Sequence, residues 1–97
     1  MRIISVSTLK AFWENFPVAE QSLRTWIKVT KAAHWNNPLA VKRTFNSADI
    51  LKEGRMVFDI GGNNYRLVAW INYPYQVLYV RFIGTHKQYD GIDADKV

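Results

Sequence analysis

The sequence predicts an α+β fold in which two or three helices from the first half pack on one face of a small, mainly antiparallel sheet. Apolar residues recur at helical spacing between residues 9 and 30, whereas three strand-like apolar runs follow one another between residues 57 and 85. The 97 residues, 48% of them hydrophobic, suffice for one core, so we expect a single domain over residues 1–97. The expected order of elements is β-α-α-(α)-β-β-β.

The first half is expected to form a short strand and then a helix. Residues 2–5 make up the strand, and the hydroxyl of Ser7 or Thr8 can cap the helix that follows. Spacings of three and four place four apolar residues on one helical face: Leu9, Phe12, Trp13 and Phe16. Pro17 ends this helix and suits the first position of the next one, because its φ is already helical.

The second helix has one apolar face and one basic face. The inward stripe is formed by Leu23, Trp26, Ile27 and Thr30, and the outer face carries Arg24, Lys28 and Lys31. The residue before Pro38 is disfavoured in a helix, so we expect a turn there. Further helical turns over residues 39–45 would carry Lys42 and Arg43, and residues 46–55 are expected to form a polar connection.

Three strands joined by tight turns fill the second half. Residues 57–60 lead into Gly-Gly-Asn-Asn at residues 61–64, which tolerate the positive φ of a hairpin turn, and the apolar alternation resumes at Tyr65. A second turn around Pro74 leads into a strand over residues 77–85. Helices that cover one face of this sheet would leave its other face open.

Alternation along the strands separates a core face from this open face. On the middle strand, Leu67, Ala69, Ile71 and Tyr73 share the core face, whereas Arg66, Val68, Trp70 and Asn72 share the other. On the last strand we expect Leu78, Val80 and Phe82 on the core face, and Val77, Tyr79, Arg81 and Ile83 opposite. Arg66 and Arg81 should therefore emerge on the open face. Three further polar residues follow at the end of the last strand: His86, Lys87 and Tyr89.

The net charge of +5 is concentrated in the middle of the chain. Residues 24–56 contain seven basic and two acidic residues, whereas residues 1–23 are balanced. This distribution favours a polyanionic partner, of which nucleic acid is the commonest. Five basic residues of the segment are candidates for RNA contact: Arg24, Lys28, Lys31, Lys42 and Arg43.

The sequence disfavours several other classes of protein. Cysteine is absent and His34 is far from His86, so we expect no metal site and no cofactor. The N-terminal apolar run is too short for a signal peptide, and no segment has the length of a membrane span, which predicts a cytoplasmic protein without a membrane partner. A DNA-binding repressor or antitoxin is also disfavoured, because no pair of short helices carries a recognition-helix pattern.

The hairpin and its exit carry two distinctive segments, VFDIGGNNYRLV at residues 57–68 and RFIGTHKQYD at residues 81–90. They resemble the HigB family of bacterial toxins, part of the RelE-like group of endoribonucleases, over about a third of the chain. The resemblance implies a RelE-like fold and the toxin of a toxin–antitoxin module, which cleaves mRNA on the ribosome, in the A site, and so inhibits translation and growth. It also implies a HigA-like helix-turn-helix antitoxin, through which alone the toxin would be linked to operator DNA.

Metal-independent cleavage of RNA needs a base for the 2′-hydroxyl, an acid for the leaving O5′ and positive charge beside the phosphate. Arg66 and Arg81 suit the charge role, because a guanidinium stays protonated and can bind two phosphate oxygens. His86 is the first candidate for proton transfer. Tyr89 is the second, since neighbouring cations are expected to favour its ionised form, and Lys87 could hold phosphate or protonate the leaving oxygen.

Convergence of these residues requires a change of chain direction. Arg81 and His86 are five positions apart, so a straight strand would place them on opposite faces unless the chain turns at Gly84-Thr85. The alternative function is a non-catalytic basic module that binds RNA or the ribosome. In that alternative the two arginines only solubilise the sheet and His86 braces the strand end, while Asp90 is expected to pair with Lys87 or a backbone N–H.

Overall fold

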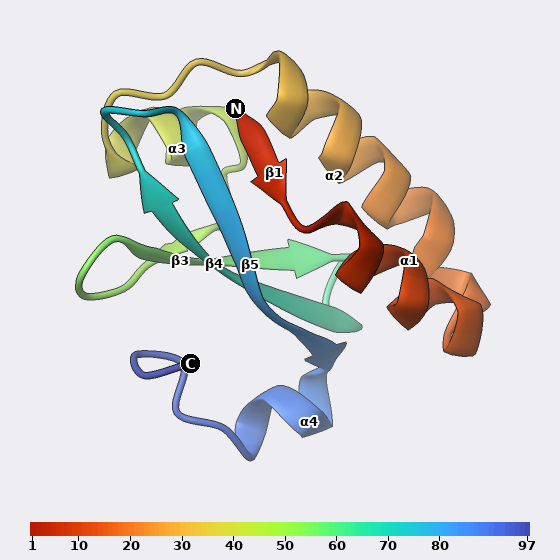
Figure 1. Cartoon of the computed structure of the whole chain (residues 1–97). Coiled ribbons are helices and arrows are strands. Elements are labelled where there is room, and N and C mark those ends of the chain that lie inside the picture. Colours follow the sequence, from red (N-terminus) through yellow and green to blue (C-terminus); the bar gives the residue numbers. More distant parts are fainter.

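The computed structural model describes all residues, 1–97, and consists of a five-stranded sheet with helices on both sides (Figure 1). In chain order the elements are β1 (Arg2–Ile4), α1 (Val6–Asn15), the 3-10 helix η1 (Pro17–Ala19), α2 (Glu20–Ala32), α3 (Pro38–Thr44), β2 (Asp49–Ile50), β3 (Arg55–Ile60), β4 (Tyr65–Asn72), β5 (Val77–Thr85) and α4 (His86–Asp90). The strand order is β1-β5-β4-β3-β2, with β1 parallel to β5 and the remaining pairs antiparallel. The predicted α+β fold is confirmed, and β2 and α4 are additional elements.

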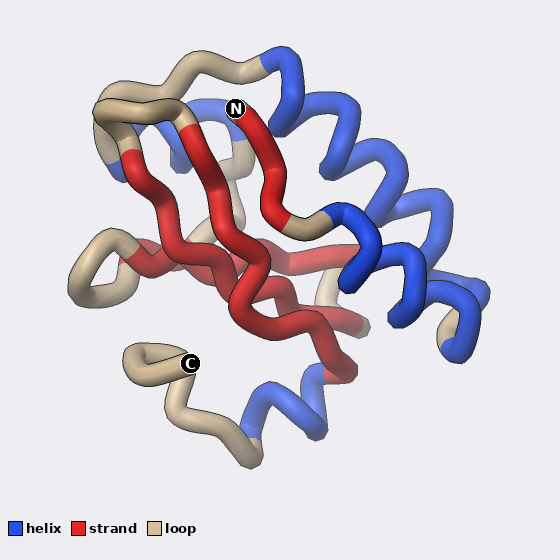
Figure 2. Tube along the Cα trace, in the orientation of Figure 1, coloured by secondary structure: helices blue, strands red, loops and turns tan.

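Local sequence accounts for the helical half of the molecule (Figure 2). Pro17 opens η1, as a residue without an N–H can do at no cost in hydrogen bonds. Asn37 caps α3, because its side-chain oxygen accepts a 2.9 Å hydrogen bond from the amide of Ala40. None of the helices combines the length and the apolar character required to cross a lipid bilayer.

The main core lies between the sheet and the helices α1, α2 and α3. This side of the sheet, which we call the helical face, presents Met56, Phe58, Ile60, Leu67, Ala69, Ile71 and Leu78. Trp26 of α2 and Phe45 pack edge-on against Phe58, with ring centroids 5.3 and 5.4 Å apart. The predicted inward residues Leu23, Trp26 and Thr30 of α2 are buried.

A β-bulge at Arg81 interrupts the alternation of β5. Val68 is the cross-strand partner of Phe82 and Ala69 that of Val80, so Arg81 has no partner on β4. The bulge reverses the faces beyond it: Ile83 packs against the main core, while Phe82 lies opposite, beside Tyr89. The prediction that Phe82 faces the core and Ile83 the other side was therefore wrong, because it assumed an uninterrupted strand.

The face predicted to be open is partly covered by the chain after β5. Val57 and Val68 are 1% and 0% exposed, although they lie outside the main core. The helix α4 packs against β5 and β4 on this side, away from α1 and α2 (Figure 1). Arg55 also donates a 2.9 Å hydrogen bond from Nε to the carbonyl oxygen of Val97. We call this side the α4 face.

Candidate active site

The strand register places Arg66 at the centre of a row of residues on the α4 face. Its cross-strand partners are Asp59 on β3 and Gly84 on β5. The guanidinium Nε lies 3.2 Å from Oδ1 of Asp59, and the side chain of Arg66 is only 11% exposed. Asp59 was not among the predicted site residues, although a four-residue turn over residues 61–64 already pairs residue 59 with residue 66.

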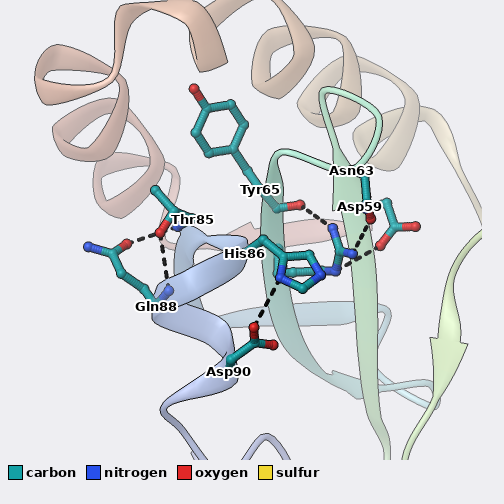
Figure 3. Close-up of polar contacts among 8 residues, drawn as sticks. Asp59, Asn63, Tyr65, Thr85, His86, Gln88 and Asp90 are labelled. Atoms are coloured by element: carbon teal, nitrogen blue, oxygen red, sulfur yellow. Dashed lines mark hydrogen bonds and ion pairs between the residues drawn. The ribbon is translucent and has the colours of Figure 1, made fainter.

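Two further contacts hold the Arg66 guanidinium in one orientation. Nη2 donates a hydrogen bond to Oδ1 of Asn63, and Nη1 donates one of 3.2 Å to the carbonyl oxygen of Tyr65 (Figure 3). Each terminal nitrogen thus keeps one N–H that has no acceptor in the protein. Asn63, predicted only as a turn residue, therefore also orients Arg66.

A capping box starts the helix α4 directly after β5. The hydroxyl of Thr85 accepts a hydrogen bond from the amide of Gln88 at 3.1 Å, and the side chain of Gln88 accepts one from the amide of Thr85 at 2.8 Å (Figure 3). The amide of His86 donates to the carbonyl oxygen of Asn64 at 3.0 Å. The first turn of α4 is therefore tied to the β3–β4 turn, at the same end of the sheet as Arg66.

His86 and Asp90 form a pair across one turn of α4. Nδ1 of His86 lies 3.2 Å from Oδ2 of Asp90, and the two side chains are 46% and 62% exposed. A carboxylate only accepts hydrogen bonds, so Nδ1 carries the proton in this contact and Nε2 presents a lone pair when the ring is neutral. Asp90 was expected to pair with Lys87 or a backbone N–H, and instead it pairs with His86.

Tyr89 keeps its proton more strongly than an ordinary tyrosine. Burial raises the pKa of its phenol, the nearby carboxylate of Asp49 raises that pKa further, and the positive charge of Arg66 opposes them. The prediction that neighbouring cations favour an ionised Tyr89 was therefore wrong, because burial and carboxylates outweigh the cation. At neutral pH the phenol is a proton donor rather than a base.

Gly84 is required for space rather than for chain flexibility. The chain does pass from strand to helix at Thr85, as a turn at Gly84-Thr85 predicts. A Cβ atom on Gly84 would lie 2.5 Å from Cζ of Phe82 and 2.8 Å from Oε1 of Gln88. The ring of Phe82 therefore occupies the volume that a side chain at Gly84 would need.

Arg81 and Lys87 are less closely integrated than the other predicted site residues. Both are exposed, and neither side chain makes a hydrogen bond or an ion pair within the protein. Arg81 is the bulged residue of β5, whereas Lys87 follows His86 on α4. The structure thus brings Arg66, His86 and Tyr89 to one end of the sheet and leaves Arg81 and Lys87 as free cations.

The five basic residues predicted to contact RNA fall into two groups. Arg24, Lys28 and Lys31 line a groove of about 380 Å³ between α1 and α2. Lys42 and Arg43 lie on α3, where Nζ of Lys42 donates a 2.9 Å hydrogen bond to the carbonyl oxygen of Ala48. Arg43 is exposed and free, so Lys42 has a structural contact that Arg43 lacks.

Known proteins resemble this chain over nearly its whole length. Residues 19–92 match the family model of the HigB toxin, described as the RelE-like toxic component of a toxin–antitoxin system. The mRNA interferase toxin HigB of Escherichia coli (strain K12) is 32% identical over 96 residues, which cover 97% of this chain and 92% of that protein. The mRNA interferase HigB of Shigella flexneri has the same values, and that of Escherichia coli O6:H1 is 29% identical over 94 residues, covering 95% of this chain and 91% of that protein.

Proposed function

Because this chain belongs to the HigB toxin family, the RelE-like toxic components of toxin–antitoxin systems, we propose that it is an mRNA interferase whose active site contains Arg66, His86 and Tyr89. The relatives named mRNA interferases align over 97% of the chain and support this activity. The observation that carries the proposal is the hydrogen bond from the amide of His86 to Asn64, which holds a proton-transfer group beside the anchored Arg66. A site of this kind has little reorganisation to undergo during the reaction.

In the proposed reaction the 2′-hydroxyl oxygen attacks the adjacent phosphorus. Nε2 of His86 takes the proton from O2′ as the O2′–P bond forms, and the P–O5′ bond breaks. The protonated phenol of Tyr89 gives its proton to O5′, which leaves a 2′,3′-cyclic phosphate and a 5′-hydroxyl. The raised pKa of Tyr89 suits this role, because the phenol is fully protonated at neutral pH.

Arg66 stabilises the negative charge that develops on the phosphorus-bound oxygens. Its two N–H groups without a protein acceptor can each bind one of these oxygens, while Asp59 and Asn63 hold the plane of the guanidinium. Arg81 and Lys87 add exposed positive charge to the path of the RNA strand. Asp90 acts through His86, since it selects the tautomer with a free Nε2 lone pair.

The substrate in this proposal is mRNA on the ribosome, in the cytoplasm. The positive charge of the middle segment would attract ribosomal or messenger RNA, with Arg43 as a direct contact and Arg24, Lys28 and Lys31 contributing to the long-range field. The regulator would be a HigA-like helix-turn-helix antitoxin, and operator DNA would be reached only through it. A non-catalytic RNA-binding module explains the charge but gives no reason for an anchored Arg66 beside an oriented His86.

Mapping of cleavage sites in cells tests the proposal. The wild-type chain and His86→Ala are induced in growing bacteria, and the 5′ ends of mRNA are sequenced. His34→Ala serves as the matched control, because His34 is the other histidine and lies exposed in the loop between α2 and α3. New 5′ ends should appear with the wild type and His34→Ala and be lost with His86→Ala. Purified protein on free mRNA and on programmed ribosomes then tests ribosome dependence, and equal cleavage by His86→Ala would reject the assigned site.

A further inference from the structure

We propose that the groove between α1 and α2 is the docking site for an acidic, amphipathic helix of the antitoxin. The inference rests on the toxin–antitoxin family assignment and not on the assignment of catalytic residues. The groove has a volume of about 380 Å³, which suits the side chains of one helix face rather than a whole helix. We call it the α1–α2 groove. Its rim is basic and its floor is apolar.

The rim carries positive charge that the protein leaves largely unpaired. Four of the seven lining residues are basic and none is acidic: Lys10, Arg24, Lys28 and Lys31. Arg24 pairs with Glu20 at 2.7 Å, whereas the three lysines have no ion-pair partner within the chain. Like charges gathered on one surface are unfavourable in the free protein, so a partner with carboxylates would relieve this repulsion.

The floor of the groove offers apolar surface below these cations. Val6 and Ile27 are half-buried, and Trp13 is 8% exposed with the guanidinium of Arg24 above its ring, 4.8 Å from the centroid. An amphipathic helix can satisfy both parts at once, because carboxylates at its edges meet the lysines while apolar side chains cover Val6 and Ile27. A nucleic acid backbone would use the charge alone and leave the aliphatic floor without a partner.

The sheet separates the α1–α2 groove from the proposed active site. Trp26 of α2 packs on Phe58 in the main core. Arg66 alternates with the core residue Leu67 and so faces the other side of the sheet, where α4 lies (Figure 1). A helix bound in the groove would therefore not contact His86 or Tyr89. Substitutions in the groove and in the active site should affect separate properties of the toxin.

Charge reversal in the groove tests the proposal. The variant carries Lys28→Glu and Lys31→Glu, and its control carries Lys52→Glu and Lys96→Glu, which change the net charge equally at exposed positions outside the groove. Affinity is measured by calorimetry against the purified antitoxin encoded beside the toxin gene. The groove variant should bind at least about 10-fold more weakly than the control, because like charges would face the acidic partner. A second variant, Ile27→Ala, should weaken binding several-fold without a change of charge.

The outcomes separate this inference from the proposed catalysis. Growth inhibition by Ile27→Ala, which leaves the charge that attracts RNA unchanged, should persist when the antitoxin is co-expressed at a level that silences the wild type. His86→Ala should still bind the antitoxin at full affinity. Unchanged antitoxin affinity in both groove variants would overturn the inference, and so would an equal loss in the Lys52→Glu, Lys96→Glu control. A groove variant that lost ribosome affinity but bound the antitoxin normally would assign the surface to RNA instead.

Discussion

The amide of His86 and the carbonyl oxygen of Asn64 are joined by a 3.0 Å hydrogen bond between segments that are far apart in the sequence. Asn64 lies in the β3–β4 turn. The preceding residue of the same turn, Asn63, accepts a hydrogen bond from Arg66. One turn therefore positions both the base and the phosphate-binding group of the proposed reaction. Changes on either side of this bond should alter the rate of cleavage more than the stability of the fold.

Asp59→Asn should lower kcat/KM for RNA cleavage roughly 10-fold, because the Arg66 fork loses its charged anchor and binds phosphate in a less defined orientation. Asp93→Asn is the matched control, since Asp93 lies exposed and its carboxylate contacts only Lys96 and the amide of Asp95, away from Arg66. In the double variant Asp59→Asn, Arg66→Lys, the loss in kcat/KM should be smaller than the product of the two single losses, because both changes remove the same oriented guanidinium. Full additivity in single-turnover assays would mean that Asp59 does not act through Arg66.

Asp90→Asn should reduce cleavage about 10-fold while leaving RNA affinity unchanged, because Nδ1 of His86 loses the carboxylate that selects its tautomer. Asp90→Glu should recover part of the rate, since a longer carboxylate can still reach the imidazole. Asp93→Asn serves as the control for the loss of one negative charge near the end of the chain, because Asp93 is not among the carboxylates that act on Tyr89. Equal rates for the Asn and Glu variants at position 90 would contradict a positioning role.

Tyr89 should give the protein an alkaline limit to its stability. Burial and Asp49 raise the pKa of its phenol above the ordinary value of 10.0, so the folded state holds this proton more tightly than the unfolded chain. This contribution is fully present below pH 10 and is lost as the pH rises through the pKa of the folded state. The free energy of unfolding of the wild type should therefore fall more steeply above pH 10 than that of Tyr89→Phe. Denaturant titrations of both proteins over this range provide the measurement.

Gly84→Ala should destabilise the protein by about 1–3 kcal/mol, because the new methyl group overlaps the ring of Phe82 and the Gln88 side chain that caps α4. Gly91→Ala is a matched control, since the nearest atom to its Cβ would be 3.5 Å away, and it should change stability by less than about 0.5 kcal/mol. Adding Phe82→Leu to Gly84→Ala should restore part of the stability. Urea denaturation of the four proteins measures the effect, and an unchanged midpoint for Gly84→Ala would contradict the steric explanation.

Arg43 and Lys42 should behave differently despite their adjacent positions. Arg43→Ala removes a free cation and should reduce the slope of log affinity against log salt by about 0.7 for ribosome or RNA binding, if it neutralises one phosphate. Lys42→Ala removes the hydrogen bond to the Ala48 carbonyl, so it should lower stability by about 1 kcal/mol. An identical salt slope for the wild type and Arg43→Ala would exclude this residue from the RNA surface.

The order of helices and strands could be predicted because each element carries its own local signal. Pro17, Pro38 and the Gly-Gly-Asn-Asn turn mark boundaries, and the spacing of apolar residues marks the type of each element between them. Which side chains at the end of β5 face the main core could not be predicted in the same way. Phe82 and Ile83 are both apolar and adjacent, which fits a strand covered on both faces, and the position of the bulge depends on pairing with β4.

The contacts within the candidate site could not be predicted from the sequence. The motif residues at positions 66, 86 and 89 do come together. The prediction of an ionised Tyr89 was wrong, because burial of the phenol and the carboxylate of Asp49, which comes from a distant strand, both raise its pKa. The capping box of Thr85 and Gln88 was readable as Thr-x-x-Gln, yet the helix that it starts is only 5 residues long. The α1–α2 groove could not be predicted either. It is lined by Lys10 of α1 together with residues of α2, and this proximity depends on how the two helices pack.

The parallel pairing of β1 with β5 bears on how the protein folds. Arg2 lies opposite Val77 and Ile4 opposite Tyr79, so this pairing closes a loop that contains most of the chain. The antiparallel pairs β3–β4 and β4–β5 need only short loops, and we expect them to form earlier in folding. Until β1 docks, β5 exposes an unpaired edge of hydrogen-bonding groups, which is a template for aggregation. Late docking of a three-residue strand would thus govern how much of the toxin reaches its native state.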